Sequence, residues 1–402
     1  MINAYRRLPL FVRILAAALL GAGLGMAIGK ESEVLKPFSD VVLQTLRLLA
    51  TPLIFLSILH SILTANLGAG KVGRLIGILL SNTVIAILIG LLVVNLVRPG
   101  VHIQLPPTAG VSAKPFDPLQ TLLDKLPKDF LNPFANNDVI AVILLGLAIG
   151  LGLRRIRTDE TEARISSVTS YVELGLRLTM QLLHWLFELV PLAVLAVTAR
   201  MVGTVGLSAV TGMIWFVGSV LLGLALMFGV YLLRLRLSSW VRPERYVRGA
   251  FDAFALAFST ASSAATLPVT YECAVAKIGV REESASIGVM VGGTFNHDGS
   301  ALYEAMAALF VSQAIGRNLG IGEQLVVVVM SVIASLGAAG IPEAGLVTML
   351  AVFNAVHLPL EYVPLLLPLD WILDRVRTTV NVAGDLASTC ILDGSQRADP
   401  IP

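Results

Sequence analysis

The strongest constraint on this sequence is the recurrence of apolar stretches of membrane-spanning length that carry no charge. They occupy residues 14–29, 48–70, 75–97, 139–153, 201–233, 253–271 and 324–342, and a further apolar region, 178–206, is interrupted by Glu188 and Arg200. A bilayer core about 30 Å thick requires roughly 20 apolar residues per helix. These stretches predict an all-α polytopic membrane protein, whereas a β-barrel would show short alternating segments.

The composition excludes other classes of protein. Of the 402 residues, 56% are hydrophobic and only 14% are charged, which fits neither an ordinary soluble enzyme nor a disordered chain. The net charge of +2 gives no support to nucleic-acid binding. Cys273 and Cys390 lie far apart, so neither a disulfide framework nor a cysteine metal site is indicated.

Lysine and arginine clusters set the predicted orientation, because cytoplasmic loops are enriched in them. All the clusters fall on one side if six helices alternate: Arg6, Arg7 and Arg13; Lys71 and Arg74; Arg154, Arg155, Arg157 and Arg164; Arg242, Arg245 and Arg248. Six spans then end near residue 240, and the proline-rich segment 98–137 is a long external loop. The first stretch is a helix rather than a signal peptide, since further spans follow. We expect a multi-pass protein of the cell inner (plasma) membrane with both termini cytoplasmic.

The C-terminal part has a different character. The small and hydroxyl-rich segments 259–268 and 335–342 interrupt apolar stretches, and Pro268 is expected to end a helix. Non-helical backbone at membrane depth is tolerated where it is buried in protein or lines a cavity. Two interruptions in corresponding positions predict a repeated unit and a transport site. The alternative for each segment alone is close packing of small residues between helices.

Charged residues concentrate in the same part of the chain. Asp298 and Glu304 lie in one apolar region, and a second carries Asp370, Asp374, Arg375, Arg377 and Asp385. Unpaired charges at the bilayer centre cost roughly 2.5–3.5 kcal/mol each on insertion scales, so these must pair, meet water or bind ions. At 100° per residue, one polar stripe on a helix contains Asp370, Asp374, Arg377, Thr378, Asn381 and Asp385. The alternative is the solvated face of a surface helix.

These segments resemble the dicarboxylate/amino acid:cation symporter family, which contains the excitatory glutamate transporters and prokaryotic glutamate/aspartate symporters. Residues 370–385, DWILDRVRTTVNVAGD, resemble its last helix, and 296–304, NHDGSALYE, its seventh. Residues 262–268 and 337–345 resemble its two re-entrant hairpins. The resemblance implies eight transmembrane helices plus two hairpins with inverted repeats, in a homotrimer that works by an elevator mechanism.

The resemblance also divides the chain into a scaffold and a moving transport domain. Scaffold helices 1 and 2 would occupy residues 1–72, and transport-domain helix 3 would occupy 73–100. The external loop and scaffold helices 4 and 5 would follow in 101–206. The rest of the transport domain would occupy 207–402.

Substrate contacts carried over from the family point to acidic amino acids. Arg377 would bind the side-chain carboxylate of L-glutamate or L-aspartate, because a guanidinium pairs bidentately with a carboxylate. Asp374 would take the amino group, with polar contacts from Thr378 and Asn381. Ser262, Ser263 and the region of Gly340 would hold the α-carboxylate. Arg375 matches the arginine of the eukaryotic branch.

Cation ligands carried over in the same way form three sites of hard oxygen atoms. The first comprises Asp385 with main-chain oxygens near Gly292, Asn296 and Asn381. The second comprises Thr294 with the carbonyls of Ser335, Leu336 and Ala338, and the third comprises Asp298, Asn296 and Thr83. No cofactor is implied, and Na⁺ is the candidate coupling ion.

The sequence departs from the family at these sites. His297 replaces the usual methionine, and Leu80 and Val84 stand near Thr83 where oxygen-bearing side chains are expected, which weakens the second and third sites. In the eukaryotic branch the glutamate corresponding to Glu304 carries the coupled proton, and a buried carboxyl can be neutral on one leg of a cycle and charged on another. His297 can titrate near physiological pH, or it can be a packing residue. We therefore expect protons to be favoured over sodium.

Other functions remain as alternatives. A C4-dicarboxylate symporter or a strictly sodium-coupled aspartate/glutamate symporter would have the same fold. An enzyme would need Ser262 or Ser263 as a nucleophile, or an aspartyl-protease motif around Asp385, but Val382 breaks the required Gly-x-Gly-Asp. No Gly-x-Ser-x-Gly or His-Glu-x-x-His motif is present. A channel would require rings of charged residues repeated across a pore, whereas the charged residues here are concentrated at one site in the C-terminal part.

Overall fold

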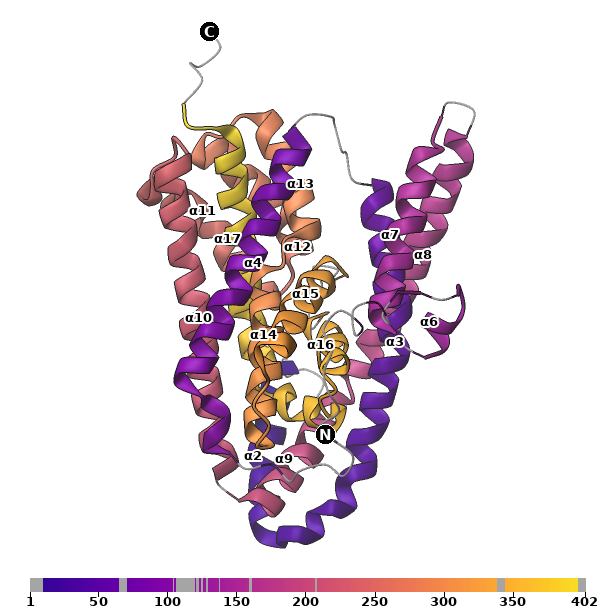
Figure 1. Cartoon of the computed structure of the whole chain (residues 1–402), viewed down its shortest axis with the longest axis vertical. Helices are drawn as coiled ribbons and strands as arrows, with labels where there is room; N and C mark the ends of the chain where they lie inside the picture. The colour runs from indigo at the N-terminus through magenta and orange to yellow at the C-terminus, as the bar shows by residue number, and fades with distance from the viewer. Residues whose placement is uncertain are drawn as a thin grey trace.

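The protein is described here by a computed structural model. It covers residues 10–64, 71–103, 105, 120, 123, 126, 127, 129–136, 138–158, 161–206, 208–337 and 344–396, and the regular elements of that part of the chain are all helical (Figure 1). The N-terminal helices are α2 (Leu10–Ile28), α3 (Lys36–Thr64), α4 (Lys71–Val97), α6 (Asn132–Ala135), α7 (Val139–Arg155), α8 (Glu162–Phe187), α9 (Val190–Val205) and α10 (Ser208–Ser238). The C-terminal helices are α11 (Pro243–Thr260), α12 (Ser263–Glu272), α13 (Glu282–Phe295), α14 (Asp298–Ala314), α15 (Ile321–Gly337), α16 (Ala344–Ala355) and α17 (Leu367–Asp393). Short turns of tighter or wider helix are η1 (Gly29–Leu35), η2 (Pro99–His102), η3 (Cys273–Ile278) and η4 (Leu360–Leu366).

The apolar stretches of the sequence fold into these helices. Three helical segments, at residues 12–38, 73–97 and 210–238, are long and apolar enough to cross a bilayer, and the pair α8–α9 makes a fourth if counted as one span. That pair is bent by 50°, so the region 178–206, expected to be one apolar segment, is divided beside Glu188. The total of eight spans and two hairpins stays a prediction.

Helix ends follow local chemistry. Asp138 caps α7 by accepting a hydrogen bond from the backbone N–H of Ala141. Pro191 lies in the first turn of α9, where proline is tolerated. At its other end α17 stops before Gly394, whose φ of 106° suits glycine. Helix α10 finishes at Ser238, close to the boundary expected near residue 240, and the count of six spans before it stays a prediction.

The first predicted interruption is present, but its cause is different. Helix α11 ends where Ala261 adopts a left-handed conformation with φ 52°, and Ser262 then caps α12. Pro268 lies inside α12, so the expectation that it ends a helix is wrong. Neighbouring groups can compensate a proline in a buried helix. At the second interruption α15 ends at Gly337 and α16 begins at Ala344; Ala338 and Gly340 fall outside the described residues.

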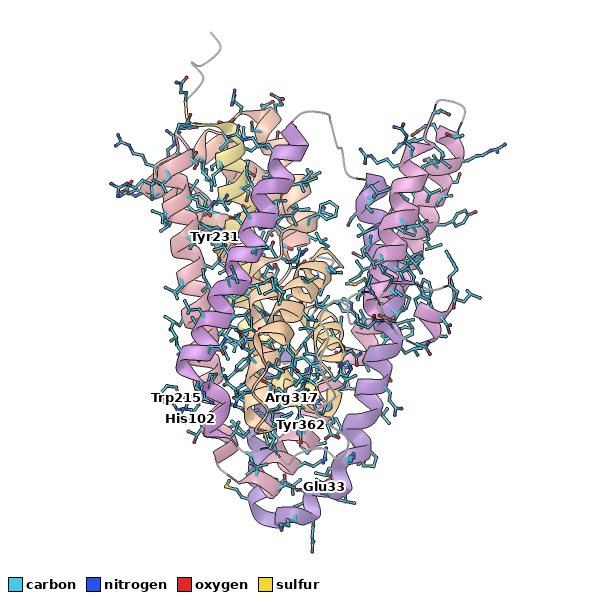
Figure 2. All side chains as sticks on the ribbon, in the orientation of Figure 1. Glu33, His102, Trp215, Tyr231, Arg317 and Tyr362 are labelled. Atoms are coloured by element: carbon cyan, nitrogen blue, oxygen red, sulfur yellow. The ribbon has the colours of Figure 1, made fainter. Side chains whose placement is uncertain are left out.

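The helices gather into two groups, with α14 in the group that contains α4 and α17. Figure 1 shows α4, α10, α11 and α17 on one side and α3, α7 and α8 on the other, with α15 and α16 between them. Helix α14 packs against α4, α17, α15 and α16 and is buried along almost its whole length. At the end of η2, the His102 ring stacks on the Trp215 ring of α10, with the ring centroids 4.6 Å apart (Figure 2).

Small residues set the packing of α2 on α9. A Cβ atom at Gly21 would lie 2.5 Å from the Leu195 carbonyl oxygen, and one at Gly25 would lie 2.3 Å from that of Ala199. Two glycines four positions apart let helix backbones approach closely, as in membrane helix pairs. Replacing either glycine would force the two helices apart.

Candidate functional site

The polar stripe predicted on the last helix is buried. All of its members lie on α17 and are at most 6% exposed: Asp370, Asp374, Arg377, Thr378, Asn381 and Asp385. The alternative of a solvated face is therefore wrong. Helices α10, α11, α13 and α14 pack around α17, so the stripe forms the polar centre of this helix group.

Arg377 is the fully buried cation of that centre. Its Nη2 atom donates to Asp370 Oδ1 at 2.7 Å and to Asp374 Oδ1 at 2.8 Å. Its guanidinium carbon lies 4.0 Å from the centroid of the Tyr303 ring, a distance typical of cation–π contact. Among the described residues, Nε and Nη1 have no hydrogen-bond partner. Two donors of a buried guanidinium thus remain for an acceptor that the described protein does not supply.

Arg375 binds elsewhere, although it stands beside Asp374 in the sequence. Its Nη1 atom donates to the carbonyl oxygens of Phe258 and Ser259 at 2.8 and 2.6 Å. A cation suits these carbonyls because they belong to the last turn of α11. The side chain also lies over the Trp371 ring at 4.6 Å. Arg375 therefore connects α17 to the end of α11, where the chain breaks before α12.

The hydroxyl and amide groups predicted to contact substrate have identifiable partners. Ser262 Oγ accepts from the Ala265 N–H at 3.2 Å as the cap of α12, and Ser263 is 3% exposed beside it. The side chain of Asn381 accepts from the Gly299 N–H at 2.8 Å. Thr378 lies in the buried stripe. Asn381 thereby joins α17 to the first turn of α14.

The residues predicted for the first cation site converge. A Cβ at Gly292 would lie 3.0 Å from Asp385 Oδ1, and one at Gly384 would lie 2.5 Å from Asn296 Nδ2. Asn296 Nδ2 donates to the Asn381 carbonyl at 3.1 Å. Asp385 Oδ1 and Asn296 Oδ1 are buried and have no partner among the described residues. Unpaired carboxylate and amide oxygens fit a hard cation such as Na⁺.

The predicted second site is less complete. Thr294 Oγ1 donates back to Met290 within α13 at 2.9 Å. The carbonyl oxygen of Ser335 lies 3.1 Å from His297 Nδ1, so the imidazole, 2% exposed, engages one of the expected ligands. Leu336 is half-buried on α15.

The third predicted site contains a residue that the sequence reasoning missed. Thr83 Oγ1 donates to Asp298 Oδ1 at 2.6 Å, as expected from the sequence. Tyr231, on α10, donates to Asp298 Oδ2 at 2.7 Å. Figure 2 labels Tyr231 where α10 runs beside α4. A tyrosine inside a charge-free span was the available signal, because a buried hydroxyl needs a partner.

Glu304 and Asp370 complete the centre. Glu304 is fully buried, accepts a hydrogen bond from Thr348 on α16, and interacts electrostatically with Arg377. Its Oε2 atom has no partner among the described residues. Asp370, which sequence reasoning placed in the stripe but not among the site residues, is ion-paired with Arg377. The seven-residue spacing to Arg377 was the signal, since it is about two helical turns.

An all-helical bundle with a helix broken beside a buried cluster of ion pairs is the architecture of a secondary transporter. Comparison with known proteins specifies the class. The sequence model of the sodium:dicarboxylate symporter family matches residues 10–395, and the chain belongs to this family. It is thus a symporter rather than an enzyme.

Relatives of the chain include amino-acid and dicarboxylate transporters. An excitatory amino acid transporter of Caenorhabditis elegans is 30% identical over 90% of this chain and 81% of its own length. A proton/glutamate-aspartate symporter of Bacillus subtilis is 30% identical over 94% of this chain and 93% of its own. A C4-dicarboxylate transport protein of Deinococcus radiodurans is 27% identical over 97% of this chain and 89% of its own.

Proposed function

We propose that this symporter imports L-aspartate or L-glutamate, with protons favoured over sodium as the coupling ion. The observation that carries the proposal is the buried Arg377, whose Nε and Nη1 donors have no partner in the described protein. A guanidinium held on one side by Asp370 and Asp374 presents its remaining donors in a fixed plane. An acidic side chain satisfies them bidentately, whereas a neutral side chain leaves them unpaired at a cost of about 1–3 kcal/mol.

The remaining contacts are assigned by the family resemblance. Asp374 takes the amino group of the substrate, and Thr378 and Asn381 add polar contacts from the same stripe. The α-carboxylate lies at the start of α12, where Ser262 and Ser263 begin a ten-residue helix whose N-terminal end favours anions. Arg375 holds α11 against α17, and Gly340 supplies backbone from the second hairpin.

We assign the coupling groups from the family resemblance, and the geometry supports part of that assignment. Asp385, Asn296, Gly292 and the Asn381 carbonyl would hold Na⁺, since two of their oxygens are unpaired. Glu304 would carry the proton, because its carboxyl sits between Thr348 and the charge of Arg377, and His297 would contribute through its contact with Ser335. The second site, with Thr294, Ser335, Leu336 and Ala338, and the third, with Asp298, Asn296 and Thr83, would contribute less.

The mechanism proposed is an elevator within a homotrimer in the cell inner membrane. The two helix groups of Figure 1 support a division into a scaffold (1–72 and 101–206) and a transport domain (73–100 and 207–402). The polar centre lies within α14 and α17, which contain most of the buried charges. Moving these helices as one body would carry the site without exposing Arg377 to lipid.

Uptake of radiolabelled L-aspartate into proteoliposomes tests the proposal. We expect uptake under an inward proton gradient alone, and none when Arg377 is replaced in Arg377→Leu. Arg236→Leu, which removes an exposed arginine of α10, is the matched control and should transport normally. Uptake driven by a sodium gradient alone, with none under protons, would contradict the proton preference.

A second candidate substrate class is favoured by one comparison. The relative from Deinococcus radiodurans is a C4-dicarboxylate transport protein, and succinate would satisfy Arg377 without needing Asp374. Competition separates the two classes. Unlabelled L-glutamate should block L-aspartate uptake. If labelled succinate is taken up instead, and unlabelled succinate competes with it while L-glutamate does not, the substrate is a dicarboxylate.

A further inference from the structure

A half-buried arginine lies close to the Asp298 carboxylate, outside the residues assigned to the predicted sites. Arg234 belongs to α10, and its Nη1 atom donates to Ser81 Oγ at 3.0 Å and to Asn82 Oδ1 on α4. Asn82 in turn donates to Ser388 Oγ on α17 at 3.0 Å. One arginine thereby joins α10 to α4, and through Asn82 to α17.

Arg234 and Asp298 meet at the same contact between helices. Tyr231, which donates to Asp298, stands one helical turn before Arg234 on α10. Thr83, the other donor to Asp298, directly follows Asn82 on α4. The guanidinium is close enough to Asp298 for their charges to interact. Both oxygens of the carboxylate therefore accept hydroxyl donors, with a fixed positive charge nearby.

This surrounding fits a bound cation poorly. A sodium ion needs several oxygen ligands around it, but Leu80 and Val84 offer none on the adjacent positions of α4 and both are partly exposed apolar side chains. Arg234 would also repel a second positive charge, and in a membrane interior such repulsion is weakly screened. An arginine at the end of a membrane span is costly unless it is paired, and the position of Arg234 beside Asp298 therefore indicates an electrostatic role.

We propose that Arg234 is a built-in counter-cation for Asp298, so that this carboxylate functions without a bound coupling cation. The inference rests on the proposed cation-coupled transport, and it specifies that the charge of Arg234 takes the place of a cation bound at Asp298. Arg234 supplies the positive charge as a side chain of the protein, so the charge remains in place in both the substrate-loaded and the empty carrier. One fewer cation then accompanies each substrate than a chain with an ion at Asp298 would need.

The charge of Arg234 can be separated from its hydrogen bonds by comparing two variants. Arg234→Gln removes the charge, Arg234→Lys keeps it, and Arg236→Gln removes an exposed arginine of the same helix as a matched control. For each protein, L-aspartate affinity is measured by calorimetry over a range of NaCl concentrations, with choline chloride holding ionic strength constant. The slope of log Kd against log sodium concentration reports the cations bound with substrate.

We expect that slope to become steeper by about one in Arg234→Gln, because the vacated charge is then supplied by sodium, and to match the wild type in the other two variants. Asp298→Asn in the otherwise unchanged chain should leave the slope unaltered. An unchanged slope in Arg234→Gln would overturn the proposal. The proposal would also be overturned if Arg234→Lys showed the steeper slope expected of Arg234→Gln, or if Asp298→Asn reduced the slope.

Melting of the substrate-free protein keeps this test independent of the proposed function. Sodium chloride, compared with choline chloride, should raise the melting temperature of Arg234→Gln more than that of the wild type or Arg236→Gln. If L-aspartate does not bind at all, the proposed substrate is wrong, yet the melting comparison still decides whether Arg234 replaces a cation. Equal sodium responses in all three proteins would overturn the inference.

Discussion

Replacement of Asp370 tests whether the ion pair behind Arg377 positions the guanidinium for substrate. Asp370 Oδ1 lies 2.7 Å from Arg377 Nη2, and the two side chains are 1% and 0% exposed. Asp374 accepts from the same nitrogen at 2.8 Å. Because Asp374 remains in Asp370→Ala, Arg377 keeps one charged partner and loses the other.

The magnitude follows from that single lost contact. A hydrogen bond to a charged group contributes about 1.5–3 kcal/mol, whereas leaving a buried charge with no partner costs about 3–5 kcal/mol. We expect a loss of about 1.5–3 kcal/mol, because Asp374 still pairs with Arg377. If the whole loss falls on substrate binding, L-aspartate affinity decreases about 10- to 150-fold. Asp370→Asn keeps an oxygen acceptor in place and should lose less.

Calorimetric binding of L-aspartate to the purified protein in detergent measures this loss, and melting temperature shows whether folding is also affected. Asp252→Ala is a suitable control, because that carboxylate pairs with Lys277 at an exposed position where ion pairs contribute little. If Asp370→Ala bound L-aspartate and melted like the wild type, the pair would have no positioning role and the reasoning would be refuted.

Three further changes test other parts of the site. Glu304→Gln should abolish uptake driven by a proton gradient while L-aspartate exchange between loaded vesicles and medium continues; pH-driven uptake in the variant would remove Glu304 from coupling. His297→Met should make L-aspartate binding more responsive to sodium, because the imidazole no longer engages the second cation site, and a steep sodium response already present in the wild type would contradict this. Gly384→Ala should lower the melting temperature, since its Cβ would lie 2.5 Å from Asn296 Nδ2 and overpacking costs about 1–3 kcal/mol. Gly229→Ala, with nothing within 4 Å, should melt at the wild-type temperature or above.

The helical class and the polar stripe could be predicted from the sequence, because apolar runs and residue spacing suffice for both, whereas the burial of the stripe needed the structure. Residues 370–385 carry polar side chains at helical intervals, and periodicity places these on one face whatever surrounds the helix. The first break was also predictable, but its mechanism was not. Pro268 was the obvious breaker, yet the break is made by the left-handed Ala261 and the Ser262 cap, features that depend on backbone conformation.

Contacts between distant segments were the part that the sequence could not supply. Tyr231 and Asp298 are separated by 67 positions, and Arg234 and Asn82 by 152. In the sequence both α10 residues belong to an ordinary apolar span and its charged end. Only the packing of α10 against α4 and α17 brings them to the site. The bend of α8–α9 beside Glu188 likewise arises from packing that hydropathy does not contain.

The charges of the polar centre explain why such a carrier requires a coupling ion. Six buried carboxyl groups lie on α14 and α17, namely Asp298, Glu304, Asp370, Asp374, Asp385 and Asp393. Among the described residues of these two helices, Arg377 is the one fully buried cation, and Arg234 adds a second charge from α10. An acidic substrate brings further negative charge into a region where unpaired charge is costly. We therefore expect protons or cations to enter with the proposed acidic substrate, and the proposed role of Arg234 reduces their number by one.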